Sequence, residues 1–331
     1  MSYHFEFRPY RRRFRRSLAT SHGSWDVREG IILCLTQETQ RIGWGEIAPL
    51  PWFGSETLEQ AEEFCQQLGN TVTEETIFSI PTVLPACQFG FESAWEALTA
   101  KIQENPPKSL SQGGNLEVGS FTPLKYSGLL PTGEPALKAW QDLWNQGYNT
   151  FKWKIGVTPI EEEFKLFHQL IAALPTEARL RLDANGGLDF SQATAWLQVC
   201  DQTGVEFLEQ PLAVDQFDAM LQLSHRYVTP IALDESVATL QQLESCYQRG
   251  WQGIFVIKAA IAGSPKRLRQ LCQTCKIDAV FSSVFESAIG RQAALKLAVE
   301  LSHNHRAVGF GINHWFSEED ETWLEKLWKR P

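Results

Sequence analysis

From residue 148 onward the chain repeats one pattern, in which a short apolar segment is followed by an amphipathic one. The short segments are typical of buried strands, and the longer ones place apolar residues at helical spacing. The predicted strands are YNTFKWKIG, ARLRLDANG, VEFLEQPL, PIALDES, GIFVIKAA and DAVFSSVFES, and helical segments such as IEEEFKLFHQLIAAL, FSQATAWLQVCDQTG and TLQQLESCYQRG lie between them. Repeated strand–helix units predict a parallel sheet, either open or closed into a barrel.

Five of these predicted strands end in a charged residue. The residues are Lys154, Asp183, Glu209, Asp234 and Lys258, at intervals of 29, 26, 25 and 24 residues. One strand–helix unit of an eight-fold barrel takes roughly 25–30 residues, which matches these intervals. Because the carboxyl ends of barrel strands face one mouth, we expect the five side chains to converge. Lys152 should join them, since residues i and i+2 of a strand share a face.

Three of the convergent residues are carboxylates from successive strands. Asp183, Glu209 and Asp234 offer hard oxygen ligands that suit Mg²⁺, with Mn²⁺ as an alternative, and no His or Cys stands beside them to favour zinc. Such an ion would hold a substrate carboxylate and stabilise negative charge that develops on it. A lysine near the ion and near other cations has a lowered pKa and can act as a base near neutral pH. The set predicts proton abstraction from a carbon next to a carboxylate.

Plainer interpretations exist for each residue taken alone. The segment Asp234-Glu235-Ser236 could cap the next helix, and DANGG could be an ordinary turn. A barrel lysine could instead form a Schiff base, as in class I aldolases, or the barrel could be a non-catalytic scaffold. These interpretations do not explain one charged residue at the same place in five successive units.

Length and composition limit the remaining classes of function. The chain has 331 residues, of which 43% are hydrophobic, enough for two domains with sizeable cores. A net charge of −9 argues against nucleic-acid binding, and we expect the basic run RPYRRRFRR at residues 8–16 to be a solvated strand edge or loop. The sequence contains no run of about 18 apolar residues, so we expect no membrane span. Scattered cysteines, seven in number, and an N-terminus without a signal-peptide core predict reduced thiols and a cytoplasmic location.

The first third of the chain has a different texture. REGIILCLTQETQRIGWGEIAPL has two apolar runs around a polar turn, which predicts a hairpin. SETLEQAEEFCQQLGN, with Ser55 as a candidate N-cap, and ACQFGFESAWEALTAKIQ predict helices. Strands followed by helices indicate an α+β domain, and the Pro-, Gly- and Ser-rich residues 105–118 are the best candidate for a linker.

The strand-end motifs resemble those of the enolase superfamily, in its muconate-lactonizing subgroup. The K-x-K of KWK, then LDANGG, LEQPL, ALDES and VIKAA, match the subgroup's pattern in order over about residues 148–290. The resemblance implies an α/β fold with a modified TIM-type (β/α)7β barrel over residues 116–310. It also implies an N-terminal α+β capping domain over residues 1–115, completed by the tail at 311–331. The expected protein is a Mg²⁺-dependent enzyme that acts on a small carboxylate substrate.

The resemblance also assigns roles to the lysines at these positions. Lys154 would be the general base, which later returns a proton to a departing hydroxyl. Lys258 would stabilise the enediolate from across the ring by its positive charge. Lys152 would approach the substrate carboxylate or the three carboxylates, which hold the metal, and would help to lower the pKa of Lys154.

Within the subgroup, the segments at 263–265 and 282–298 resemble members that dehydrate 2-succinyl-6-hydroxy-2,4-cyclohexadiene-1-carboxylate to 2-succinylbenzoate, a step in menaquinone and phylloquinone synthesis. The predicted substrate contacts are Asn185, Gly263, Ser264, Ser283, Glu286 and Ser287. Residues 17–26 are a candidate lid, and residues 50–54 are a second candidate contact. Dipeptide epimerases, N-acylamino acid racemases and muconate cycloisomerases carry the same flanking lysines and stay open as alternatives.

Overall fold

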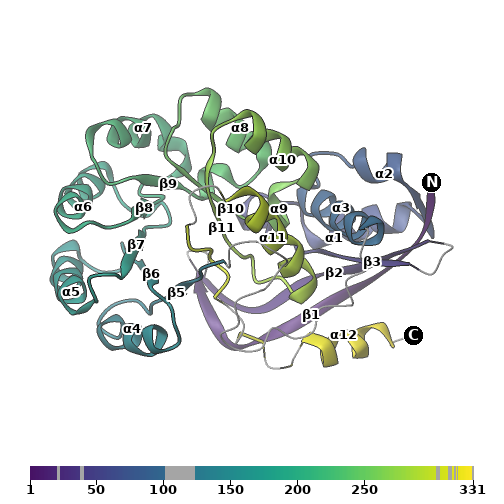
Figure 1. Cartoon of the computed structure of the whole chain (residues 1–331), viewed down its shortest axis with the longest axis horizontal. Coiled ribbons are helices and arrows are strands. Elements are labelled where there is room, and N and C mark those ends of the chain that lie inside the picture. The colour runs from purple at the N-terminus through teal and green to yellow at the C-terminus, as the bar shows by residue number, and fades with distance from the viewer. Residues whose placement is uncertain are drawn as a thin grey trace.

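The structure is a computed structural model that describes residues 1–20, 23–37, 41–100, 124–302, 306–311, 315–316, 318 and 320–329. Two units lie side by side in it (Figure 1). The described residues up to 100 form an antiparallel sheet with helices, which we call the cap, and the described residues from 124 to 311 form a curled parallel sheet with helices outside it, which we call the barrel. The predicted boundary at residue 115 and the predicted linker at 105–118 lie outside the described residues.

The cap sheet has the strand order β3-β2-β1-β4, with every pair antiparallel. Its strands are β1 (Ser2–Thr20), β2 (Gly23–Thr36), β3 (Ile42–Ile47) and β4 (Thr71–Thr73). The pairing of β2 with β3 confirms the predicted hairpin. Along β1, Tyr10 and Phe14 are buried while Arg11 and Arg13 are exposed, because successive side chains of a strand point to opposite faces.

The cap helices cover one region of this sheet (Figure 1). They are η1 (Pro51–Phe53), α1 (Leu58–Gln67), α2 (Glu74–Phe78) and α3 (Pro85–Thr99). The N-cap of α1 is Thr57, which forms a capping box with Gln60, and not Ser55, whose hydroxyl accepts from the Leu50 N–H at 2.6 Å. Helix α3 packs very closely on β3, because a Cβ at Gly43 would collide with the Ala94 carbonyl.

The barrel sheet consists of parallel strands in the order β11-β10-β9-β8-β7-β6-β5. These are β5 (Ser127–Leu129), β6 (Thr150–Lys154), β7 (Arg179–Asp183), β8 (Phe207–Glu209), β9 (Ile231–Leu233), β10 (Ile254–Ile257) and β11 (Asp278–Phe281). Val308 bridges to Tyr126 beside β5, and Gly309 bridges to Ser282 beside β11, both in parallel. This short segment closes the curled sheet, as the (β/α)7β fold class predicted.

Helices surround the barrel sheet on its outer face (Figure 1). They are α4 (Ala136–Asn145), α5 (Ile160–Ala173), α6 (Phe190–Thr203), η2 (Val214–Gln216), α7 (Phe217–Arg226), η3 (Glu235–Val237), α8 (Leu240–Gln248), α9 (Ala259–Ala262), α10 (Pro265–Thr274) and α11 (Ala288–Leu301). Local sequence explains several boundaries. Asp189 and Gln192 form a capping box at the start of α6, and Gly204 ends that helix in the left-handed conformation.

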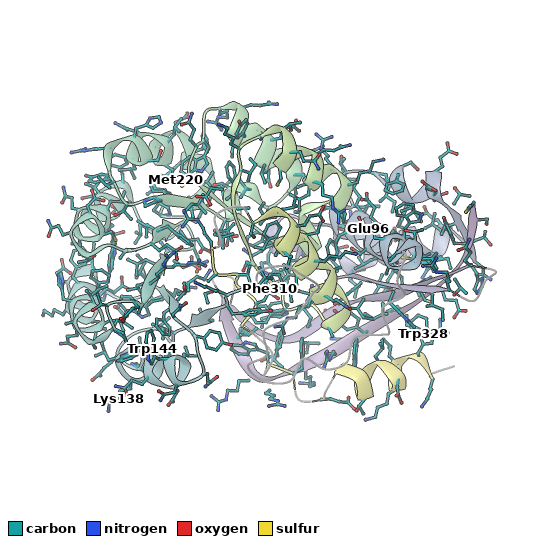
Figure 2. The ribbon with its side chains drawn as sticks, viewed as in Figure 1. Glu96, Lys138, Trp144, Met220, Phe310 and Trp328 are labelled. Carbon is teal, nitrogen blue, oxygen red and sulfur yellow. The ribbon has the colours of Figure 1, made fainter. Side chains whose placement is uncertain are left out.

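The C-terminal helix α12 (Asp320–Trp328) returns to the cap. Trp323 packs edge-on against Tyr10 at 5.0 Å, and Trp328, at one side of the cap in Figure 2, packs against Trp44 at 4.5 Å. Within the basic run, Arg12 differs from the solvated residue we expected. It is 4% exposed, with its guanidinium 4.3 Å from the Trp323 ring centroid, because the tail covers this part of β1.

Glutamates of the cap hold it to the barrel. Glu96, on α3 near the barrel helices in Figure 2, pairs with Arg269 of α10. Glu92, also on α3, accepts from the Lys266 N–H at 3.0 Å. Glu46 of β3 accepts from the Ser287 and Gly290 N–H groups at 2.9 and 3.0 Å, at the start of α11. Each contact joins residues more than 170 positions apart in the chain.

Two expectations from composition can be compared with the structure. Among the described residues, no helix combines the length and the apolar character that crossing a membrane needs. All seven cysteines are free thiols, and six of them are buried. Cys272 lies on α10 within the core, and Cys275, three residues later, is only half-buried.

Candidate active site

Strand register brings the predicted residues to one end of the barrel. Lys154 is the direct partner of Asp183 in the β6–β7 pair, and Asp183 is the direct partner of Glu209 in the β7–β8 pair. Asp234 and Lys258 directly follow the last residues of β9 and β10. All five residues therefore lie where neighbouring parallel strands end, which is the edge at which barrel enzymes bind substrates.

The alternation along β6 explains how one strand carries two lysines. Phe151 and Trp153 are buried on the face that packs against the helices. Lys152 and Lys154 share the opposite face and are only partly buried. Carboxylates of the adjacent strands lie on this face, and their negative charges stabilise the lysine ammonium groups.

The lysines differ in their partners. The ammonium of Lys152 lies 2.8 Å from Asp183 Oδ2 and 2.7 Å from Glu209 Oε1, and it bridges these two carboxylates. Lys258 is paired with Asp234. Lys154 has no hydrogen bond or ion pair through its ammonium group among the described residues. Of the three lysines, it alone is available to take part in proton transfer without breaking an ion pair.

Burial and mutual charge shift the pKa values of these groups. Burial, and next the charge of Asp183, raises the pKa of Glu209 to about 8. Burial raises the pKa of Asp234 to about 6, although Lys258 opposes this. Asp183 has a lowered pKa, because Lys152 outweighs the opposing effect of burial. These shifts favour the neutral, protonated forms of Glu209 and Asp234 and the charged form of Asp183.

Lys152 has a raised pKa. Burial acts to lower its pKa, but the charges of Asp183 and Glu209 outweigh burial and raise it. Lys152 is thus a permanent cation that orders its neighbours.

The donor set fits a hard divalent ion. Three carboxylates on adjacent strand ends supply oxygen ligands only. Burial penalises their charged forms and raises the pKa of Glu209 and Asp234, a penalty that a bound cation would relieve. Within the described residues, no group of three His, Cys, Asp or Glu side chains lies close enough together to hold a metal ion. The three carboxylates pair instead with the ammonium groups of Lys152 and Lys258. Asp183, Glu209 and Asp234 as the metal ligands stay a prediction.

The cap contributes an aromatic side chain to the site. The ring centroid of Phe53, in η1, lies 3.9 Å from the Lys258 ammonium, which is cation–π distance. Phe53 belongs to residues 50–54, which we predicted from the sequence as a second candidate substrate contact. The predicted lid at 17–26 includes the ends of β1 and β2 that the structure describes.

The six predicted substrate contacts occupy several loops beyond the strands. Asn185 has φ +44°, and its N–H donates to Asp183 Oδ1 at 3.0 Å, so it is next to the carboxylates. Ser264 caps α10 and Ser287 caps α11. Ser283 donates to Glu286 at 2.8 Å within one buried turn. As substrate contacts, these residues and Gly263 stay predictions.

Three residues that hold this site together were not predicted from the sequence. Gln210 follows Glu209 and is 0% exposed, with side-chain bonds to two other segments. Glu163 of α5 accepts from the Gly156 and Val157 N–H groups, both at 2.9 Å, just beyond Lys154. Glu46 holds the start of α11. Only Gln210 gave a signal, as a polar residue between a strand end and a proline.

Comparisons with known proteins add independent information. A family model described as "Enolase C-terminal domain-like" matches residues 136–326, and one described as "MenC, N-terminal domain" matches residues 13–98. The chain is 41% identical to an o-succinylbenzoate synthase of Thermosynechococcus vestitus over 334 aligned residues, which covers 98% of each chain. It is 28% identical to an o-succinylbenzoate synthase of Pasteurella multocida, covering 84% of this chain and 80% of that one.

Solved structures agree with these matches. The o-succinylbenzoate synthase of Thermosynechococcus elongatus, complexed with Mg in the active site, has a TM-score of 0.87 at 40% identity, covering 99% of this chain and 100% of that one. A dipeptide epimerase of Enterococcus faecalis, with Mg and a dipeptide, has a TM-score of 0.80 at 20% identity over 96% and 93% of the chains, and this likeness concerns the fold alone. By fold, strand-end residues and sequence identity together, the chain belongs to the o-succinylbenzoate synthase family of the enolase superfamily.

Proposed function

We propose that this chain is a Mg²⁺-dependent lyase that dehydrates 2-succinyl-6-hydroxy-2,4-cyclohexadiene-1-carboxylate to 2-succinylbenzoate, a step in menaquinone or phylloquinone synthesis. The observation that carries the proposal is the ammonium of Lys154, which has no partner among the described residues and lies beside the Asp183–Glu209 pair, in a chain 41% identical to an o-succinylbenzoate synthase. Lys154 is the proposed base, and Lys258, from another strand, is the proposed electrostatic partner.

The proposed proton transfers begin and end at Lys154 Nζ. As a neutral amine, Lys154 takes the proton from the ring carbon that bears the carboxylate. The bond from the neighbouring ring carbon to its hydroxyl then breaks, and Lys154 returns the proton to the departing oxygen, which leaves as water. The new double bond completes an aromatic ring. No oxidant or reductant is required.

Other charged residues of the chain stabilise and order the site. Lys258 places a positive charge near the negative charge that develops on the substrate carboxylate. Lys152 keeps Asp183 and Glu209 together through its two ion pairs. We propose that Asp183, Glu209 and Asp234 hold Mg²⁺, or Mn²⁺ in its place. When bound, the ion supplies Lewis-acid stabilisation of the substrate carboxylate as it gains charge.

The cap is proposed to close this site. Phe53 covers the Lys258 ammonium from the cap side, which helps to exclude water from the charges below it. We propose that residues 1–115, with the tail at 311–331, form the capping domain and that residues 116–310 form the catalytic barrel. The contacts of α12 with β1 support the place of the tail. The free thiols support a cytoplasmic location.

A direct assay tests the proposed reaction. The purified chain is incubated with the cyclohexadiene acid, and formation of the aromatic product is followed by absorbance with Mg²⁺, with EDTA, and with EDTA followed by excess Mg²⁺. We expect dehydration that EDTA abolishes and that added Mg²⁺ restores. No dehydration in the presence of Mg²⁺ would reject the proposal.

Two further measurements separate the alternatives. Exchange of the α-proton of an N-acylamino acid in deuterated water, at a rate comparable to dehydration, would favour a racemase or epimerase. Trapping of a carbonyl substrate on a lysine by borohydride, unaffected by EDTA, would favour a Schiff-base aldolase. We expect neither result.

A further inference from the structure

Gln210 connects the ends of three adjacent barrel strands. It directly follows Glu209 at the end of β8 and is 0% exposed. Its backbone N–H donates to the Ala232 carbonyl on β9 at 2.8 Å, and its carbonyl accepts from the Gly186 N–H beyond β7 at 2.7 Å. The residue has φ +37°, a left-handed conformation that non-glycine residues adopt only where surrounding contacts impose it.

The side-chain amide of Gln210 uses both of its ends. Its oxygen accepts from the backbone N–H of Asp234 at 3.0 Å and of Ser236 at 3.2 Å. Its nitrogen donates to the Leu212 carbonyl at 3.0 Å and to the Ser236 hydroxyl at 2.8 Å. Backbone N–H groups only donate and a backbone carbonyl only accepts, so these partners fix the orientation of the amide.

From these contacts we propose that Gln210 is a positioning residue, which fixes Asp234 relative to Glu209 so that both carboxylates can bind one divalent ion. This inference rests on the proposed function, because it concerns the same carboxylates. The Gln210 backbone directly follows Glu209, and its side-chain oxygen accepts from the N–H of Asp234. A single residue therefore links the backbone positions of the two carboxylate residues.

Only an amide of this length can make these contacts. A glutamate at this position has no donor for the Leu212 carbonyl and would add negative charge to a site already rich in carboxylates. An asparagine is one methylene shorter. A methionine fills the space but leaves the N–H groups of Asp234 and Ser236 buried without acceptors.

The test is magnesium affinity, measured by isothermal titration calorimetry on the metal-stripped full-length protein with MgCl₂ as the ligand. The variants are Gln210→Met and Ser236→Ala, and the control is Gln216→Met, an exposed glutamine on the same connection. Loss of a residue that orients metal ligands typically weakens metal binding by about 10–100-fold. We expect a loss of this size for Gln210→Met, a smaller loss of a few-fold for Ser236→Ala, and no change for Gln216→Met.

The outcomes are distinguishable from one another. A Gln210→Met variant that melts earlier but binds Mg²⁺ as tightly as the wild type shows a purely structural role and overturns the inference. If Gln210→Met does not fold, Ser236→Ala decides, since it removes one partner of the amide, and an unchanged magnesium affinity again overturns the inference. A wild-type protein that binds Mg²⁺ but does not dehydrate the cyclohexadiene acid overturns the proposed function and leaves the role of Gln210 in metal binding intact.

Discussion

Arg181 and Asp183 stand two residues apart on the same face of β7, yet they belong to charge clusters of different character. The mouth cluster consists of Lys152, Lys154, Asp183, Glu209, Asp234 and Lys258. The floor cluster, toward the amino ends of the strands, consists of Arg181, Glu206, Asp278 and Arg306. The cations of the mouth cluster are lysines, and those of the floor cluster are arginines. We relate the first to chemistry and the second to closure of the barrel.

The floor cluster is built from planar, many-fold hydrogen bonds. Arg306 forms a fork with Asp278, with both N···O distances at 2.8 Å, and also donates to Glu206 at 3.0 Å. Arg181 donates to Glu206 at 2.7 Å and to the Ala307 carbonyl at 2.8 Å, next to the segment that closes the barrel. Arginine does not give up its proton near neutral pH, so this network can fix geometry but cannot transfer protons.

The mouth cluster contains side chains that can gain or lose a proton. Lysine is a compact ammonium that changes its protonation more readily than arginine, and Lys154 has no ion-pair partner among the described residues. The carboxylates there have shifted pKa values because they are buried and close together. The comparison predicts that substitutions at the mouth change rate while substitutions at the floor change stability.

The largest expected effect is that of Lys154→Ala on the rate. Loss of a general acid–base group typically costs about 10²–10⁴-fold, and we expect about a 10³-fold fall in kcat with the melting temperature little changed. The control is Lys138→Ala, which removes a lysine that is exposed on α4 and lies at the periphery in Figure 2. Steady-state kinetics and circular dichroism measure the two quantities, and near-normal kcat in a folded Lys154→Ala variant would contradict the role of this residue.

Glu206→Gln should produce the opposite pattern. The change leaves the buried guanidinium of Arg181 without its carboxylate, and breaking a buried ion pair costs about 3 kcal/mol in the free energy of unfolding. We expect kcat per folded molecule to stay within about twofold, a ratio that corresponds to less than 1 kcal/mol of activation free energy. Urea unfolding and active-site titration provide the measurements. A folded variant with a large loss of kcat would show that the floor also takes part in the chemistry.

Phe53→Leu sharpens the comparison by testing the cap at the mouth. Loss of a partly buried cation–π contact is worth about 1 kcal/mol, so we expect kcat/KM to fall about five-fold. Phe78→Leu is a matched control, because the Phe78 ring also lies over a barrel lysine, Lys266, at 4.7 Å, on α10. Equal effects of the two substitutions on kcat/KM would point to the general docking of the cap and not to the active site.

The smallest expected effect is a pH dependence of stability from Glu206. Burial acts to raise its pKa, but Arg181 and Arg306 outweigh burial and hold the pKa below its usual value. The resulting stabilisation is fully present above about pH 4.3, the usual glutamate value, and is lost as the pH falls through the folded-state pKa. Melting temperatures from pH 7 to pH 3 should therefore converge between the wild type and Glu206→Gln. A constant difference across this range would remove Glu206 as the source.

Several features of the site could be predicted from sequence because they depend on local periodicity. A strand of period two places Lys152 and Lys154 on one face, and regular strand–helix units bring Asp183 and Glu209 to the same edge. Both features depend only on the order and spacing of residues along the chain. The closed barrel and the cap came from the resemblance, since periodicity alone left the sheet open or closed.

Other features were decided by tertiary structure, because they join residues that no local pattern relates. The choice of Lys152, and not Lys154, as the bridge between two carboxylates depends on side-chain geometry across adjacent strands. Phe53 lies over Lys258 although about 200 residues separate them in the sequence. Arg306 donates to Glu206, which lies 100 residues earlier in the chain. The sequence by itself determined which charged residues meet, since strand period and unit length set their order. Folding decided which of them are paired, covered or left available for chemistry, since burial and distance exist only in three dimensions.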